Sequence, residues 1–167
     1  MSSTIPEAKR EAIAAVVGQT VREMRVYDIH THLYDPAFGE LLLWGIDDQL
    51  VYHYLVAEAF RHFDIGYETF WRLAKEEQAQ MIWDALFVEN SPLSEACRGV
   101  LTALNRLGLD ANQRDLPSIR KWFAEQDSGD YITRCMDVAK VRTICMTNSP
   151  FDELETPNWD AGFERDE

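Results

Sequence analysis

The sequence predicts an α/β chain that is mostly helical, in which a long helical excursion joins two short strands. Residues 25–30 ("RVYDIH") and 141–147 ("VRTICMT") carry the β-branched and aromatic residues typical of strands. Nearly all of the 110 residues between them, 31–140, have helical patterns. Because a crossover of this length usually joins parallel neighbours, we expect the two segments to pair in parallel.

The helices are expected in chain order around these strands. The first covers residues 6–24, with a capping-box pattern formed by Thr4 and Glu7 and with Pro6 in the first turn. Five further helical segments follow: 47–63, 67–88 with a break near Ala74, 91–108, 116–126 and 129–140. The segment 91–108 has Ser91 as its expected N-cap and Gly108 as its stop.

Composition and charge narrow the classes of function. The formal net charge is −13, which argues against a nucleic-acid partner because phosphate backbones are repelled. No apolar run approaches the length of a membrane span, and charges interrupt any signal-like core at the N-terminus. Cys97, Cys135 and Cys145 match no zinc spacing. We expect three reduced, mostly buried thiols in a cytoplasmic protein.

Two of the four histidines, His30 and His32, stand one residue apart at the end of the first strand. Side chains alternate along a strand, so both imidazoles would point the same way and could bind one divalent metal ion, with zinc the first choice. Asp28 shares that face and could orient a histidine. The alternative is that both are surface histidines where a strand meets a loop.

A second group of reactive residues lies in the expected helix 47–63. On a helical wheel His53, Tyr54 and Arg61 fall in one wedge, whereas most of the remaining surface is apolar. Reactive groups gathered in one wedge of a packed helix indicate a pocket. His62 lies about half a turn from His53, so the two cannot form a second metal pair. The alternative is that His53 and Tyr54 pack with their polar tips satisfied.

Taken in order, these motifs resemble the N-terminal portion of the uronate (glucuronate) isomerase family, within the amidohydrolase superfamily. That family has an H-x-H on its first strand, then a helical insertion beginning with a histidine–tyrosine helix. After the second strand comes a loop similar to "TNSPFDEL", residues 147–154 here. One departure concerns the helix: the family usually has Asp-His-Tyr-Lys, where this chain has Tyr52 and Leu55 at the outer positions.

The resemblance implies a fold and an activity. The chain would supply strands one and two of a (β/α)8 barrel, and the family interconverts aldose and ketose acids such as D-glucuronate and D-fructuronate. His30 and His32 would hold the metal, His53 and Tyr54 would act as catalytic residues on a small uronate sugar, and Arg61 would bind substrate. For Asp152 we expect only a turn or a helix cap.

Three segments are expected: an N-terminal helix and first strand (1–34), a helical subdomain that folds alone (35–140), and a second strand with a truncated acidic end (141–167). A barrel needs about 200 residues at least, so we expect this chain to be an inactive N-terminal part. Its strand edges favour a homo-oligomer. Two alternatives stay open: another metal-dependent hydrolase or TatD-like nuclease of the superfamily, and a non-catalytic helical assembly module.

Overall fold

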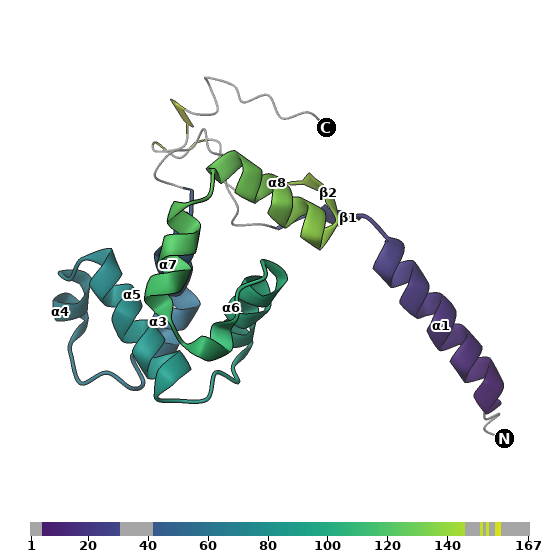
Figure 1. Ribbon diagram of the computed structural model, residues 1–167, viewed down its shortest axis with the longest axis horizontal. Coiled ribbons are helices and arrows are strands. Elements are labelled where there is room, and N and C mark those ends of the chain that lie inside the picture. Colours follow the sequence, from purple (N-terminus) through teal and green to yellow (C-terminus); the bar gives the residue numbers. More distant parts are fainter. Residues whose placement is uncertain (1–4, 31–41, 146–150, 152, 154–155, 158–167) are drawn as a thin grey trace. The chain divides into compact units, whose positions relative to one another are not determined.

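The computed structural model describes residues 5–30, 42–145, 151, 153 and 156–157, and this part of the chain is mostly helical (Figure 1). The elements follow one another as α1 (Glu7–Glu23), β1 (Val26–Asp28), α2 (Gly45–Leu50), α3 (His53–Ala59), α4 (Tyr67–Trp71), α5 (Lys75–Trp83), the π-helical η2 (Asp84–Val88), α6 (Glu95–Arg106), the 3-10 helix η3 (Ala111–Gln113), α7 (Leu116–Ala124), α8 (Ser128–Ala139) and β2 (Val141–Ile144). The chain divides into two compact units, one formed by residues 1–31 with 133–167 and the other by residues 32–132.

The two strands form a small parallel sheet, as the sequence predicts. Val26 pairs with Val141 and Tyr27 with Thr143, with an irregularity in register between Val26 and Tyr27. Both strands are shorter than expected: β1 ends at Asp28, and β2 ends at Ile144 within the described residues. The pairing closes with a hydrogen bond of 2.7 Å from the backbone N–H of Cys145 to the carbonyl of Asp28.

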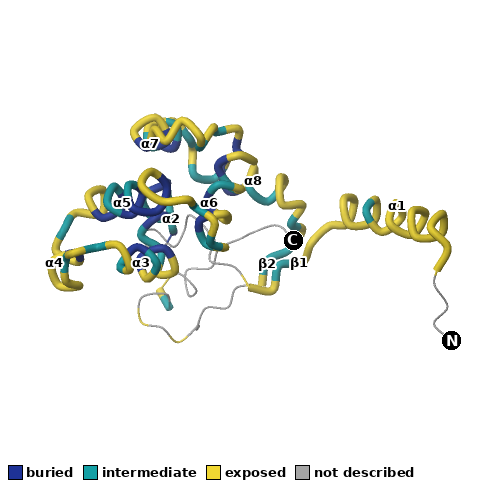
Figure 2. The backbone as a smooth tube through the Cα atoms, turned by 90° about the horizontal axis from the view of Figure 1, so that it is seen from below, coloured by how far each residue is buried: buried dark blue, intermediate teal, exposed yellow. Residues whose placement is uncertain are grey.

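The hydrophobic core lies in the helical unit, residues 32–132. Every buried apolar residue found in the described part of the chain falls between Leu42 and Ile132. The largest fully buried side chains include Trp83 and Phe70. In Figure 2 the dark blue segments accordingly lie on the helices of this unit, whereas α1 is exposed along almost its whole length. Helix α2 packs against α5 and α7 through Ile46 and Leu50, which are both buried.

One arginine holds these three helices together. Arg120 on α7 donates from Nε to both carboxylate oxygens of Asp47 on α2, at 2.9 and 3.1 Å. Its Nη1 donates to Gln80 Oε1 on α5 at 3.2 Å, and its Nη2 donates to the carbonyl of Glu76 at 2.8 Å. The Arg120 guanidinium can lie half-buried with little loss of free energy, because these hydrogen bonds offset its desolvation.

The expected single helix over 47–63 is wrong, because two helices cover this stretch. The backbone of Tyr52 is extended, with ψ at 142°, and it separates α2 from α3. In one continuous helix Leu55 would lie about 140° around the axis from Leu50. Both residues are buried, so the break lets two differently facing apolar residues reach the core.

Helix ends were predicted with mixed success. The break near Ala74 and the stop at Gly108 are confirmed: Ala74 is the N-cap of α5, and Gly108 has a φ of 86°, which favours glycine. The N-cap of α6 is Ser94 and not Ser91, since its side-chain oxygen accepts from the backbone N–H of Cys97 at 3.1 Å. Helix α1 begins after Pro6, and Thr4 lies outside the described residues.

The prediction for the cysteines is correct only in part. None of the three cysteines forms a disulfide, but only Cys97 is buried, while Cys135 is half-buried and Cys145 is exposed. Burial raises the pKa of the Cys97 thiol above its ordinary value, which keeps this group protonated and inert. Among the described residues, none of the helices combines the length and apolar character that crossing a membrane requires.

Candidate functional site

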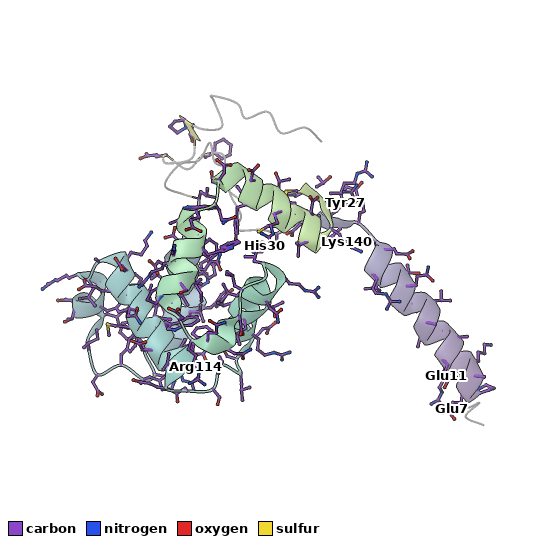
Figure 3. All side chains as sticks on the ribbon, in the orientation of Figure 1. Glu7, Glu11, Tyr27, His30, Arg114 and Lys140 are labelled. Atoms are coloured by element: carbon purple, nitrogen blue, oxygen red, sulfur yellow. The ribbon has the colours of Figure 1, made fainter. Side chains whose placement is uncertain are left out.

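The first candidate site follows strand β1, in the unit formed by the two ends of the chain. His30 is exposed and lies in a bend two residues after β1 ends at Asp28. Figure 3 labels His30 together with Tyr27 of β1 and Lys140, which precedes β2. His32 lies outside the described residues, so the predicted pairing of its ring with that of His30 stays a prediction.

Asp28 fixes the backbone at this bend. Its Oδ1 accepts a hydrogen bond from the backbone N–H of His30 at 3.1 Å, while its carbonyl accepts from Cys145 after β2. A carboxylate that accepts from the N–H two residues later forms an Asx-type turn. The first strand, expected to run to His30, ends at Asp28, so strand alternation does not fix the direction of the His30 side chain. Asp28 instead connects the histidine bend to the neighbouring strand through the backbone.

The second candidate site lies in the helical unit, at the start of α3. His53 and Tyr54 are the first two residues of that helix and both are exposed, with 63% of Tyr54 accessible. Their rings are in contact, with centroids 4.1 Å apart and planes inclined by 44°. The backbone break at residues 51 and 52 brings these two rings to a helix end. The structure therefore places together the two residues that the sequence predicts as catalytic.

Tyr52 is a third member of this ring cluster that the sequence reasoning did not select. Its ring centroid lies 4.2 Å from that of His53 and 5.7 Å from that of Tyr54. Burial raises the pKa of the Tyr52 hydroxyl, and Tyr54 adds to this, so the phenol stays protonated. The signal was present in the sequence as three consecutive ring residues, but a continuous helix would have pointed Tyr52 away from its neighbours.

Arg61 does not share the wedge that the sequence predicts. Helix α3 ends at Ala59, and Arg61 lies in the turn beyond it, where its backbone N–H donates to the carbonyl of Glu58 at 3.1 Å. Arg61 is exposed and stands at the opposite end of α3 from His53, roughly 12 Å away along the helix. Asp152, expected to be a turn or cap, lies outside the described residues.

The chain matches no protein-family model and no curated protein. Among solved structures it is similar to the crystal structure of a uronate isomerase from Bacillus halodurans C-125, with 47% sequence identity and a TM-score of 0.88. Along nearly its whole length, this chain is similar to a uronate isomerase. The match covers 98% of this chain and 38% of the B. halodurans uronate isomerase, which is consistent with an N-terminal portion.

The predicted resemblance to uronate isomerases is therefore confirmed. Because the match covers nearly all of this chain, the helical excursion between the two strands belongs to the fold shared with the B. halodurans uronate isomerase. It is not an addition particular to this sequence. The chain spans well under half the length of that protein.

A metal ion fits the donor atoms of this chain only as a partial site. Within the described ranges, no three His, Cys, Asp or Glu side chains come together in a way that could hold a metal. His30 supplies an imidazole, a ligand that suits zinc, and Asp28 fixes the backbone beside it. His32, which would complete the pair, is not among the described residues.

Proposed function

We propose that this chain is the N-terminal part of a metal-dependent uronate isomerase that interconverts an aldose acid and a ketose acid, such as D-glucuronate and D-fructuronate. The observation that carries the proposal is the 47% identity to a uronate isomerase over 98% of the chain. In this proposal β1 and β2 are the first two strands of a (β/α)8 barrel of the amidohydrolase superfamily. The enzyme would work in the cytoplasm on a soluble sugar acid.

The reaction moves hydrogen between two neighbouring carbons. A base removes the proton from C2 of the aldose, and the C1 carbonyl oxygen takes up a proton, which gives an enediol. The C2 hydroxyl then loses its proton while C1 gains one, so that the carbonyl has moved from C1 to C2 and no atoms are lost. Such steps need acid and base groups within hydrogen-bond reach of both oxygens.

His53 and Tyr54 are proposed as these proton-transfer groups. An imidazole and a phenol can each donate or accept a proton, and their contacting rings present both groups at one helix end. Both side chains are exposed and so can reach a substrate. Arg61, at the other end of α3, would act only on a part of the substrate remote from the reacting carbons, such as its carboxylate.

His30 and His32 are proposed to hold the metal ion, most simply zinc. The bound metal would supply positive charge that anchors the substrate's carboxylate and a neighbouring hydroxyl. Catalytic zinc sites usually have three protein ligands, and this pair supplies two. The remaining ligands would come from the part of a uronate isomerase that this chain does not match, so we expect the 167-residue chain alone to be inactive.

The test uses a chimera in which this chain replaces the matching 38% of the B. halodurans uronate isomerase. The chimera should convert D-glucuronate to D-fructuronate. His53→Ala and Tyr54→Phe should each lower kcat about 100-fold or more, without changing the bound zinc. His30→Ala should lower the bound zinc itself, measured by elemental analysis.

Tyr67→Phe is the matched control for Tyr54→Phe, because Tyr67 is also an exposed tyrosine in the first turn of a short helix. It should leave kcat unchanged. A folded, zinc-containing chimera that hydrolyses esters or amides and does not isomerise glucuronate would replace the proposal with a hydrolase. Equal losses for Tyr54→Phe and Tyr67→Phe would remove Tyr54 from the catalytic set.

A further inference from the structure

Tyr52 joins helices α2 and α3, and the backbone is held on both sides of it. Val51, the residue before it, donates its N–H to the carbonyl of Asp47 at 2.9 Å and so closes α2. The carbonyl of Tyr52 accepts from the N–H of Val56 at 3.1 Å, which is the first hydrogen bond of α3. Leu50 and Val56, on either side of this junction, are buried. The packing of the two helices therefore fixes the backbone position of Tyr52.

The side chain of Tyr52 is also the most enclosed of the three neighbouring rings. Tyr52 is half-buried, and its hydroxyl oxygen is buried. His53 and Tyr54 are both exposed. An exposed side chain at the start of a helix can change rotamer freely unless a neighbour restricts it. Tyr52 is therefore the one ring of the cluster whose backbone and side chain are both anchored in the helical unit.

The anchored ring of Tyr52 contacts both of the exposed rings. Its plane is inclined by 50° to that of His53, with the centroids 4.2 Å apart, and by 64° to that of Tyr54, with the centroids 5.7 Å apart. Within the described ranges, the ring contacts of His53 are those with Tyr52 and Tyr54. Inclined aromatic pairs at such distances attract one another. Because one of its two neighbours is fixed, the His53 imidazole has fewer orientations than an isolated exposed histidine.

We propose that Tyr52 is a positioning residue, whose anchored ring holds the His53 imidazole, and with it the Tyr54 phenol, in the orientation that proton transfer on the sugar acid requires. The inference rests on the proposed function, in which His53 and Tyr54 carry the protons. Tyr52 transfers no proton itself, because its hydroxyl oxygen is buried. Acid and base groups accelerate a reaction only when they lie within hydrogen-bond reach of the reacting atoms, so their orientation contributes directly to kcat.

The kinetic test uses the same chimera with the B. halodurans uronate isomerase. Tyr52→Leu removes the flat ring and should lower kcat for D-glucuronate about tenfold, because the proton-transfer groups remain but are less well oriented. KM should stay within about twofold, since these groups act in the transition state and not in substrate binding. Tyr52→Phe keeps the ring and should restore kcat to within about twofold of wild type. The bound zinc should be the same in all three proteins.

Tyr67→Leu is the matched control, because Tyr67 also begins a helix of the same unit and stacks on Phe60, with the ring centroids 4.0 Å apart. It removes a comparable ring contact that does not involve His53, and it should leave kcat unchanged. A second measurement needs no activity. In the full 167-residue chain, Tyr52→Leu should shift the NMR signals of the His53 ring protons, identified by their loss in His53→Ala, because an aromatic ring shields protons in contact with it. Tyr52→Phe should leave these signals nearly in place.

The outcomes separate this inference from the proposed function. A wild-type chimera that does not isomerise D-glucuronate overturns the proposed function and this inference with it. An active wild-type chimera whose kcat is unchanged by Tyr52→Leu overturns the inference alone. Equal losses of kcat in Tyr52→Leu and Tyr67→Leu would also overturn it, as would a Tyr52→Phe variant as slow as Tyr52→Leu. So would His53 signals that do not move in Tyr52→Leu.

Discussion

Replacing Arg120 with alanine should destabilise the helical unit in a way that depends on pH. The substitution removes the hydrogen bonds from the guanidinium to Asp47, to Gln80 and to the carbonyl of Glu76. It therefore loosens three helices at once, α2, α5 and α7. It also leaves the Asp47 carboxylate, only 26% exposed, without its cation.

The expected loss of stability at pH 7.5 is about 2–3 kcal/mol. Breaking a fully buried ion pair costs roughly 3–5 kcal/mol, whereas an exposed pair contributes about 0–1 kcal/mol. Arg120, at 19% exposed, lies between these limits but nearer the buried one. A matched control is Lys121→Ala on the same helix, since Lys121 is 78% exposed and pairs with Glu125 at 3.9 Å. That change should cost less than about 0.5 kcal/mol.

The pH dependence follows from the carboxyl that is left behind. Burial raises the pKa of Asp47 above its ordinary value of 3.8, and this outweighs the lowering by Arg120. A raised pKa in the folded state means that the carboxyl favours folding when protonated, and that this contribution is lost as pH rises through the folded-state pKa. Without Arg120 the pKa rises further, so the penalty of Arg120→Ala should be smaller at about pH 4, near the ordinary value of 3.8, than at pH 7.5.

Urea unfolding followed by circular dichroism, at both pH values, measures these differences. Adding Asp47→Asn to Arg120→Ala should recover about 1 kcal/mol at pH 7.5, because the uncompensated charge is removed. A penalty for Arg120→Ala that is equal at both pH values would refute the assigned role of Asp47. A penalty no larger than that of Lys121→Ala would refute the role of Arg120 itself.

Four further substitutions test the packing and the hydrogen bonds of the helical unit. Ser94→Ala should cost about 1 kcal/mol by removing the N-cap of α6, whereas Ser91→Ala should have almost no effect, as compared by urea midpoints. Leu50→Ala should cost about 2–5 kcal/mol in thermal unfolding, because Leu50 is fully buried. Hydrogen bonds from Ser118 lower the pKa of the Asp115 carboxyl below its ordinary value of 3.8. The stability that this carboxylate contributes is therefore present above pH 3.8 and is lost as the pH falls through its lower folded-state pKa. In Ser118→Ala, NMR titration should find the pKa of Asp115 closer to 3.8.

The sequence predicts those features of the fold that depend on local chemistry. Gly108 follows a helix and has a φ of 86°, a conformation that glycine adopts readily. The position of this glycine in the sequence is enough to predict the helix end. The parallel pairing of the two strands follows from the long crossover between them.

Prediction fails where tertiary packing decides between two local solutions. Leu93, Cys97, Val100 and Leu104 have helical spacing, which favours a helix starting before Leu93. Leu93 is 79% exposed, so no neighbour is present to bury it, and Ser94 begins the helix instead. The split of 47–63 has the same cause, since the direction in which each apolar residue finds its core cannot be known from spacing alone.

In the candidate site, too, contacts between adjacent residues could be predicted, whereas those that depend on the length of a helix or strand could not. The contact of His53 with Tyr54 could be predicted because the two are adjacent, whereas the wedge with Arg61 depended on a helix that ends first at Ala59. For His30, the two-residue alternation of a strand was extended past Asp28, where a side chain to backbone hydrogen bond has already turned the chain. A pattern of side-chain directions holds only as far as the backbone hydrogen bonds that maintain it.

Substitutions of apolar residues should have different effects on stability in the two units of this chain. In the helical unit, large apolar residues such as Leu50 and Trp83 are enclosed, so substitutions there change the free energy of unfolding. In the other unit, Val17 and Tyr27 are exposed, so substitutions there should leave the free energy of unfolding nearly unchanged. A change at Val17 that lowered the stability of the isolated chain as much as Leu50→Ala does would mean that α1 packs within this chain.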